Sequence, residues 1–131
     1  MTIDTALRTY LKSFPALYAK VGEKIFPAIA ADATVAPYMT FNEIGVNQGG
    51  GNEVENYEKY YQFSIYAKTY TAMREIVEIM ETIFFNRPGP AVYAGIKIVG
   101  GTLNGSRDMP LDLTSGNYSA ALDVKIKYYK I

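Results

Sequence analysis

The chain has 131 residues with 13 basic and 13 acidic side chains, and it contains no cysteine and no histidine. This length is typical of a single domain, 1–131, and is enough to bury a core without a metal or a disulfide. The composition excludes disulfides, zinc–thiolate sites, thiol nucleophiles and imidazole chemistry, and the neutral balance gives no overall field that favours nucleic acid or an anionic membrane.

The N-terminal region predicts a helix pair. Apolar residues recur at helical spacing, namely at Ile3, Leu7, Tyr10, Leu11 and Phe14. Thr2 or Asp4 is suited to cap this helix, because a short side-chain oxygen accepts from an unpaired N–H of the first turn. Pro15 either starts a second short helix, Pro15 to Val21, or kinks the first, and Gly22 is a natural stop.

The middle of the chain predicts strands and one long helix. Glu23 to Ile29 is extended, Tyr38 to Val46 alternates, and Asn47 to Asn52 is a Gly-rich loop. Tyr57 to Ala67 alternates between an apolar face and a polar face, as in a sheet packed on one side and solvated on the other. Thr69 is placed to cap the helix Thr71–Phe84, whose apolar stripe is Ala72, Met73, Ile76, Val77, Met80, Ile83 and Phe84.

The C-terminal region is less regular until its last strand. We expect a bend at Gly100-Gly101, a tight hairpin turn at Asn104-Gly105, and a weak edge strand over Arg107 to Leu113. Thr114 to Asn117 is a turn, and Tyr118–Tyr129 is a clean alternating strand. The predicted buried cluster comprises Leu7, Leu11, Phe63, Ile65, Met73, Ile76, Met80, Leu122, Val124 and Ile126.

Catalytic and cofactor motifs find little support. The Gly49-Gly50-Gly51 loop lacks the Lys-Ser/Thr of a phosphate-binding loop, and Gly100-Gly101 does not precede a helix. Glu75, Glu78 and Glu81 share a helix side but lack an EF-hand loop, so they indicate a solvated face. The serines have no histidine to activate them, and no Gly-x-Ser-x-Gly elbow occurs. We therefore expect no catalytic residue, no metal and no cofactor.

Tyrosine usage is the feature that points toward an interface. The chain has 12 tyrosines and no tryptophan. Tyr60, Tyr66 and Tyr129 fall on faces that the alternation assigns to solvent, and tyrosine is enriched where proteins meet. Two alternatives stay open: both sheet faces are covered within the monomer, or these rings shield the backbone.

No apolar run approaches the roughly 20 residues of a membrane span, and the N-terminus carries an acid where a secretion signal carries basic residues. We therefore expect cytosolic expression and no membrane partner.

The order of these elements resembles a known family. The segments that carry the resemblance are Gly22 to Pro27, Ala36-Pro37-Tyr38-Met39-Thr40-Phe41, Glu58 to Tyr70, the long helix, and Gly116 to Ile126. Over nearly the whole chain this is similar to the tail-completion (tail-terminator, head–tail joining) proteins of long-tailed bacteriophages. Asn86 to Asp112 departs most from that pattern, being longer and richer in Gly and Pro.

The resemblance implies an α+β fold, with a mainly antiparallel sheet and with the long helix and the N-terminal helix pair packed on one face. It also implies a non-enzymatic structural protein of a phage or prophage tail, located in the virion tail and, during assembly, in the host bacterial cytoplasm. Subunits of the family form a ring, commonly of six, that ends the tail tube and joins it to the head connector, with no sequence-specific nucleic acid contact.

A ring of identical subunits needs two different complementary patches on each subunit. The expected interface residues are Asn47, Gln48, Asn52, Tyr60, Tyr66 and Tyr129. Two other functions compete with this one: a small α+β binding module for a peptide or small ligand, which requires a concave apolar pocket, and an enzyme, which requires a perturbed carboxylate or lysine in a cleft.

Overall fold

The computed structural model describes residues 2–28, 34–48, 56–85 and 89–130. Two helices begin the chain: α1 (Ile3–Lys12) and α2 (Pro15–Val21). The Thr2 side chain accepts a hydrogen bond from the Thr5 N–H at 3.2 Å, so Thr2 is the cap of α1. Pro15 opens a separate helix rather than kinking the first, and Gly22 ends it at a φ of 58°, as its position predicts.

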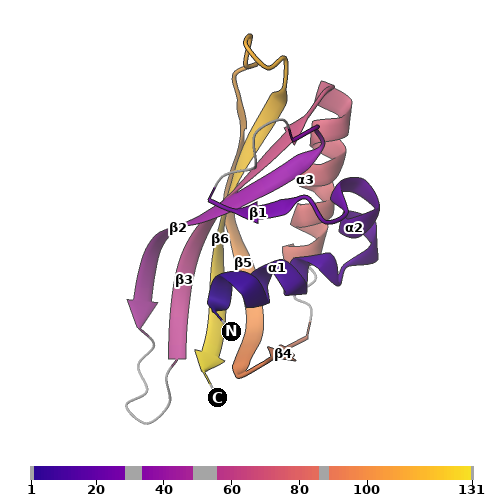
Figure 1. Cartoon of the computed structure of the whole chain (residues 1–131). Helices are drawn as coiled ribbons and strands as arrows, with labels where there is room; N and C mark the ends of the chain where they lie inside the picture. The colour runs from indigo at the N-terminus through magenta and orange to yellow at the C-terminus, as the bar shows by residue number, and fades with distance from the viewer. Residues whose placement is uncertain (1, 29–33, 49–55, 86–88, 131) are drawn as a thin grey trace.

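The described residues form one six-stranded sheet in the order β1-β2-β3-β6-β5-β4. All neighbouring strands are antiparallel except β1 and β2, which are parallel. The strands are β1 (Ile25–Pro27), β2 (Tyr38–Gln48), β3 (Asn56–Ala67), β4 (Ala91–Tyr93), β5 (Ile96–Met109) and β6 (Tyr118–Lys130). Figure 1 shows β5 and β6 running past the helices to the connection that joins them at one end of the sheet.

One long helix, α3 (Tyr70–Phe85), packs on β3, β5 and β6. The Thr69 hydroxyl accepts from the Ala72 N–H at 3.1 Å, which confirms the predicted cap. The predicted stripe is buried except for Ala72, which is half-buried. All ten residues of the predicted buried cluster lie in the core, each at most 1% exposed. The predicted α+β fold, with its mainly antiparallel sheet, is therefore confirmed.

All three helices serve the same face of the sheet. The Phe63 ring lies 6.3 Å from the Phe84 ring of α3, and the Tyr61 hydroxyl donates to the Asp4 carboxylate of α1 at 3.0 Å. Phe63 and Tyr61 are two residues apart in β3 and so point to the same side. We call this side the inner face. Within the described residues, no helix covers the opposite side, the outer face.

The region before the last strand corrects our prediction. Neither a bend at Gly100-Gly101 nor a turn at Asn104-Gly105 ends a strand: β5 continues through both and pairs with β6 from Ile96 to Met109. Register shifts after Ile98 and after Leu103 absorb the irregularity. Arg107 to Met109 is the end of β5, not a separate strand, and Pro110 lies just beyond it.

Gly101 shows why glycine occurs inside this strand. Its position faces α3, and a Cβ there would stand 2.7 Å from a ring carbon of Phe84 and 2.9 Å from a methyl of Ile126. The glycine marks a close approach of helix to sheet, not a chain reversal.

Candidate interaction surface

The outer face is built by the polar half of each alternating strand. Cross-strand partners point to the same side, so the pairing of β2, β3, β6 and β5 arranges outer-face residues in rows. From the end near the β5–β6 connection the rows are Tyr38, Tyr66, Ser119, Met109; then Thr40, Ser64, Ala121, Arg107; then Asn42, Gln62, Asp123, Gly105; then Gly45, Tyr60, Lys125, Thr102.

The first row carries a tyrosine pair. The Tyr38 and Tyr66 rings stack with centroids 4.7 Å apart and planes 20° from parallel. Burial raises the pKa of the Tyr38 hydroxyl, and the neighbouring Tyr66 and Asp112 add to this. Tyr66 is therefore half-buried by a neighbour on its own face rather than held in solvent alone.

The second row contains small side chains that are already shielded from solvent. Thr40 and Ala121 are only 6% and 1% exposed although they point outward. Arg107 is the cross-strand neighbour of Ala121 and reaches Asp123, with the guanidinium 3.1 Å from the carboxylate oxygen. The ion pair therefore lies next to Ala121, at the β5 side of this row.

The far end of the outer face is basic and aromatic. Lys125 lies beside Tyr60 in one row, Lys127 beside Glu58 in the next, and Tyr129 beside Lys97 in the last. The Lys125 ammonium is 3.8 Å from the Glu58 carboxylate. Among the described residues, no carboxylate lies within ion-pair distance of Lys97 or Lys127.

The structure places three of the six predicted interface residues on one face of the sheet, but it does not bring all three together. Tyr60, Tyr66 and Tyr129 are all half-buried on the outer face, Tyr60 and Tyr129 near its basic end and Tyr66 at the other. Asn47 and Gln48 end β2, where their backbones pair with Glu58 and Tyr57. Asn52 and the Gly49-Gly50-Gly51 loop lie outside the described residues.

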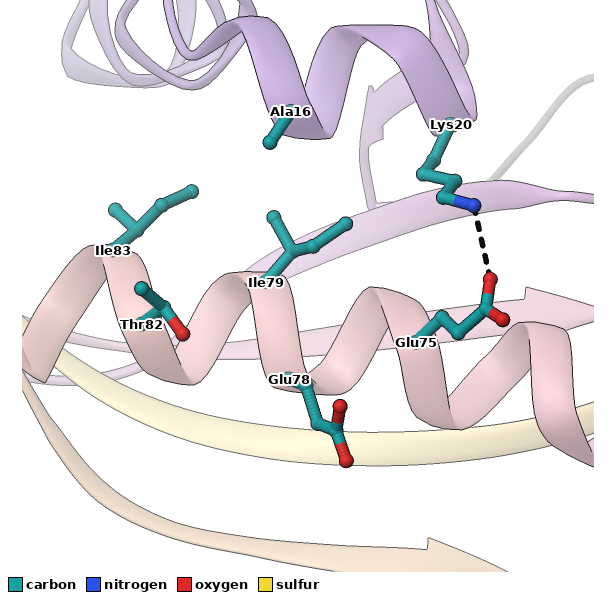
Figure 2. Close-up of a pocket in the computed structure, with 7 residues that line it drawn as sticks. All are labelled: Ala16, Lys20, Glu75, Glu78, Ile79, Thr82 and Ile83. Atoms are coloured by element: carbon teal, nitrogen blue, oxygen red, sulfur yellow. Dashed lines mark hydrogen bonds and ion pairs between the residues drawn. The ribbon is translucent and has the colours of Figure 1, made fainter.

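A groove between α2 and α3 was missed by the sequence analysis. It has a volume of about 520 Å³ and is lined by Ala16, Lys20, Glu75, Glu78, Ile79, Thr82 and Ile83. Figure 2 shows the aliphatic side chains of Ile79 and Ile83 facing Ala16 across the groove, with Lys20 and Glu75 bridging it at one end. The Lys20 ammonium lies 2.9 Å from the Glu75 carboxylate, so these two charges satisfy each other rather than converging on a ligand.

Two carboxylates at the end of the sheet near the β5–β6 connection have structural contacts. The Asp108 carboxylate accepts from the Tyr70 hydroxyl at 2.7 Å and from Arg74 at 3.0 Å, and these bonds lower its pKa. Asp112 accepts from the Thr114 N–H and the Ser115 hydroxyl, both at 2.9 Å, which lowers its pKa and orders the β5–β6 connection. Within the described ranges, no three potential metal-binding side chains come together. None of the described helices combines the length and hydropathy that crossing a bilayer requires.

Comparison with known proteins adds one finding. No protein-family model and no curated protein matches the sequence. The fold is similar to that of a chain in a solved structure described as the virion of a native gene transfer agent particle. The TM-score is 0.70 and the identity 11%, over 92% of this chain and 90% of that chain. At this identity the likeness shows a shared fold.

Proposed function

We propose that this protein is a non-enzymatic structural component of a phage tail or a phage-like particle. The observation that carries the proposal is the fold likeness to a chain of a gene transfer agent virion, because it extends over nine-tenths of both chains. The order of sequence elements supports the same class independently, since it resembles phage tail-completion proteins.

The finer form of the proposal is a ring. Identical subunits form a ring that ends the tail tube and joins it to the head connector, in the virion tail of a particle assembled in bacterial cytoplasm. The outer sheet face supports this form, because it presents tyrosines together with Lys97 and Lys127, for which the described part of the chain provides no carboxylate partner and no covering helix. The proposed contacts between ring subunits comprise Asn47, Gln48, Asn52, Tyr60, Tyr66 and Tyr129.

Deletion of the gene from the genome that encodes the particle tests the proposal. We expect electron microscopy to show tails that are unattached to heads or abnormal in length, and a wild-type copy supplied in trans should restore normal particles. Normal, head-joined tails after the deletion would refute the tail-completion function.

A second variant tests the contribution of the Gly49-Gly50-Gly51 loop separately. Deletion of residues 49–52 should reproduce the assembly defect while leaving the thermal unfolding of the purified protein close to that of wild type. Normal particles with this variant would remove the loop from the interface and leave the rest of the proposal standing.

A further inference from the structure

Charge is segregated on this molecule although the whole chain is neutral. Lys97, Lys125, Lys127 and Tyr129 share the far end of the outer face, and we call these four residues the basic patch. Only one acidic residue, Glu58, lies in the same rows among the described side chains. The described side chains of these rows therefore carry an excess of positive charge.

The α2–α3 groove has the opposite character. Glu78 and Glu81 have no cation within ion-pair distance among the residues that the structure describes, and Glu75 is shared only with Lys20. Figure 2 shows the Glu78 side chain pointing away from α2 and from Lys20. Phe85 is seven residues beyond Glu78, on the same side of α3, and is 85% exposed. The groove is thus apolar at its base, and the adjoining side of α3 carries Glu78, Glu81 and the exposed Phe85 ring, of which only Glu78 lines the groove itself.

These two surfaces cannot meet within one subunit. The helices that form the groove pack on the inner face, and the basic patch lies on the outer face. Among the described residues, Lys97 and Lys127 have no carboxylate partner and Glu78 and Glu81 have no cation partner, so the two surfaces are complementary in potential, which steers association and fixes its orientation.

We infer that the basic patch of one subunit docks into the α2–α3 groove of a second copy. The Tyr129 ring packs against Ile79 and Ile83, and Lys97 and Lys127 lie beside Glu78 and Glu81. This inference rests on the proposed function, because it names the two surfaces through which the ring subunits associate.

The contact is head-to-tail. A pair of bound subunits still presents one free groove and one free patch, so the association does not stop at a dimer; it gives a ring where the rotation between subunits closes and an open filament where it does not. A two-fold dimer, in which one surface pairs with itself, would place lysines against lysines.

Cross-linking tests the contact, because the chain has no cysteine of its own. Thr82→Cys puts a thiol in the groove, and Thr102→Cys puts one beside Lys125 on the outer face; both threonines are exposed. The two variants are made as separate chains, one isotope-labelled, then mixed and oxidised. Mass spectrometry then distinguishes mixed dimers from dimers of either variant alone.

We expect mixed Thr82→Cys/Thr102→Cys dimers to form on the order of tenfold faster than either same-variant dimer, given the usual size of electrostatic steering. The matched control replaces Thr102→Cys by Thr114→Cys, an equally exposed threonine in the β5–β6 connection. Mixed dimers that form no faster than with this control would overturn the inference.

A charge exchange gives a second readout. Adding Glu78→Lys and Glu81→Lys to the groove variant should reduce mixed dimers to the control rate. Adding Lys97→Glu and Lys127→Glu to the sheet variant should then restore them, whereas a merely unfolded groove variant would not be rescued. Absence of rescue would overturn the inference. A second result would also overturn it: no mixed dimers form, and Lys97→Glu/Lys127→Glu abolishes binding of the protein to DNA. That result would assign the basic patch to nucleic acid.

The experiments distinguish failure of the proposed tail function from failure of the proposed contact between subunits. Preferred mixed dimers combined with normal particles after gene deletion would refute the tail role and retain the self-contact. Defective particles combined with control-level cross-linking would retain the tail role and move the subunit contact to other surfaces.

Discussion

The two faces of β6 place very different surfaces on one backbone. Toward the helices, Leu122, Val124 and Ile126 are completely buried, while the intervening Asp123, Lys125 and Lys127 are partly exposed on the outer face. The inner face is held by apolar packing that depends on close fit. The outer face combines small side chains with long polar chains and tyrosines, and we expect removal of its exposed polar chains to cost the monomer little. We therefore expect the stability of the fold to depend far more on the inner face than on the outer face.

The largest expected effect tests the inner face. Ile76→Ala removes a side chain that is 1% exposed, so it should lower the free energy of unfolding by about 2–5 kcal/mol through lost burial and the cavity left behind. Lys127→Ala on the outer face should change it by less than about 0.5 kcal/mol. Urea denaturation of both variants measures the difference. Similar losses for the two would contradict the division between the faces.

The fit between helix and sheet is tested by two glycines of the same strand. Gly101→Ala forces a Cβ against the Phe84 ring and the Ile126 methyl, and such overpacking typically costs about 1–3 kcal/mol. Gly105→Ala has nothing within 4 Å of the new Cβ and should be close to neutral. Thermal denaturation compares the pair. Equal melting temperatures would show that α3 can move away from β5 without cost.

Alkaline pH should weaken the inner face selectively. Burial raises the pKa of the Tyr10 hydroxyl from 10.0 to about 12, and the pKa of Tyr61 is also raised, first by burial and then by Asp4. A raised pKa means that the folded state holds the proton more tightly. The stabilisation is therefore complete below pH 10 and is lost as the pH rises toward 12.

Tyr10→Phe isolates this effect. The Tyr10 hydroxyl is buried without a described hydrogen-bond partner, so its removal should leave stability at pH 7 unchanged or raise it by about 1 kcal/mol. The loss of stability above pH 10 should become shallower than in wild type. Tyr129→Phe on the outer face is the control, and an identical pH profile for Tyr10→Phe and wild type would contradict the prediction.

The smallest effect belongs to the outer face itself. Arg107 and Asp123 pair at 3.1 Å but remain about half and a third exposed, so a double-mutant cycle should give a coupling of only about 0.2–1 kcal/mol. Added salt should reduce it further. A coupling above about 2 kcal/mol would mean that the outer face also holds the fold together.

Sequence periodicity correctly predicted the strands and helices in which packing against the rest of the protein agrees with the local pattern of apolar residues. The alternation of Tyr57 to Ala67 and of Tyr118 to Tyr129 matches the observed strands within a residue, because one side of each strand is buried over most of its length, from Tyr61 to Ala67 and from Ala120 to Tyr128. β5 was missed because Gly100-Gly101 and Asn104-Gly105 carry strong local turn signals. Pairing with β6 along its whole length overrides those signals, and the close approach of Phe84 explains the glycine at 101.

The candidate surface was predictable only in part. Alternation places Tyr60, Tyr66 and Tyr129 on one face, but it does not show that Tyr66 stacks on Tyr38, since that contact depends on the register between two strands. The α2–α3 groove leaves no local signal at all. It arises where two helices joined by long stretches of other structure are packed side by side, which periodicity within either helix does not reveal.

The position of β6 also determines when the sheet can be completed. It lies between β3 and β5, and both of those strands precede it in the chain, so each keeps an unpaired edge until residues 118–130 have emerged from the ribosome. Unpaired edges are where strands of different molecules join wrongly. A pause in synthesis after β5 would therefore expose two unpaired strand edges, those of β3 and β5, at once. For the same reason, a chain truncated before Tyr118 should aggregate rather than form a smaller folded protein.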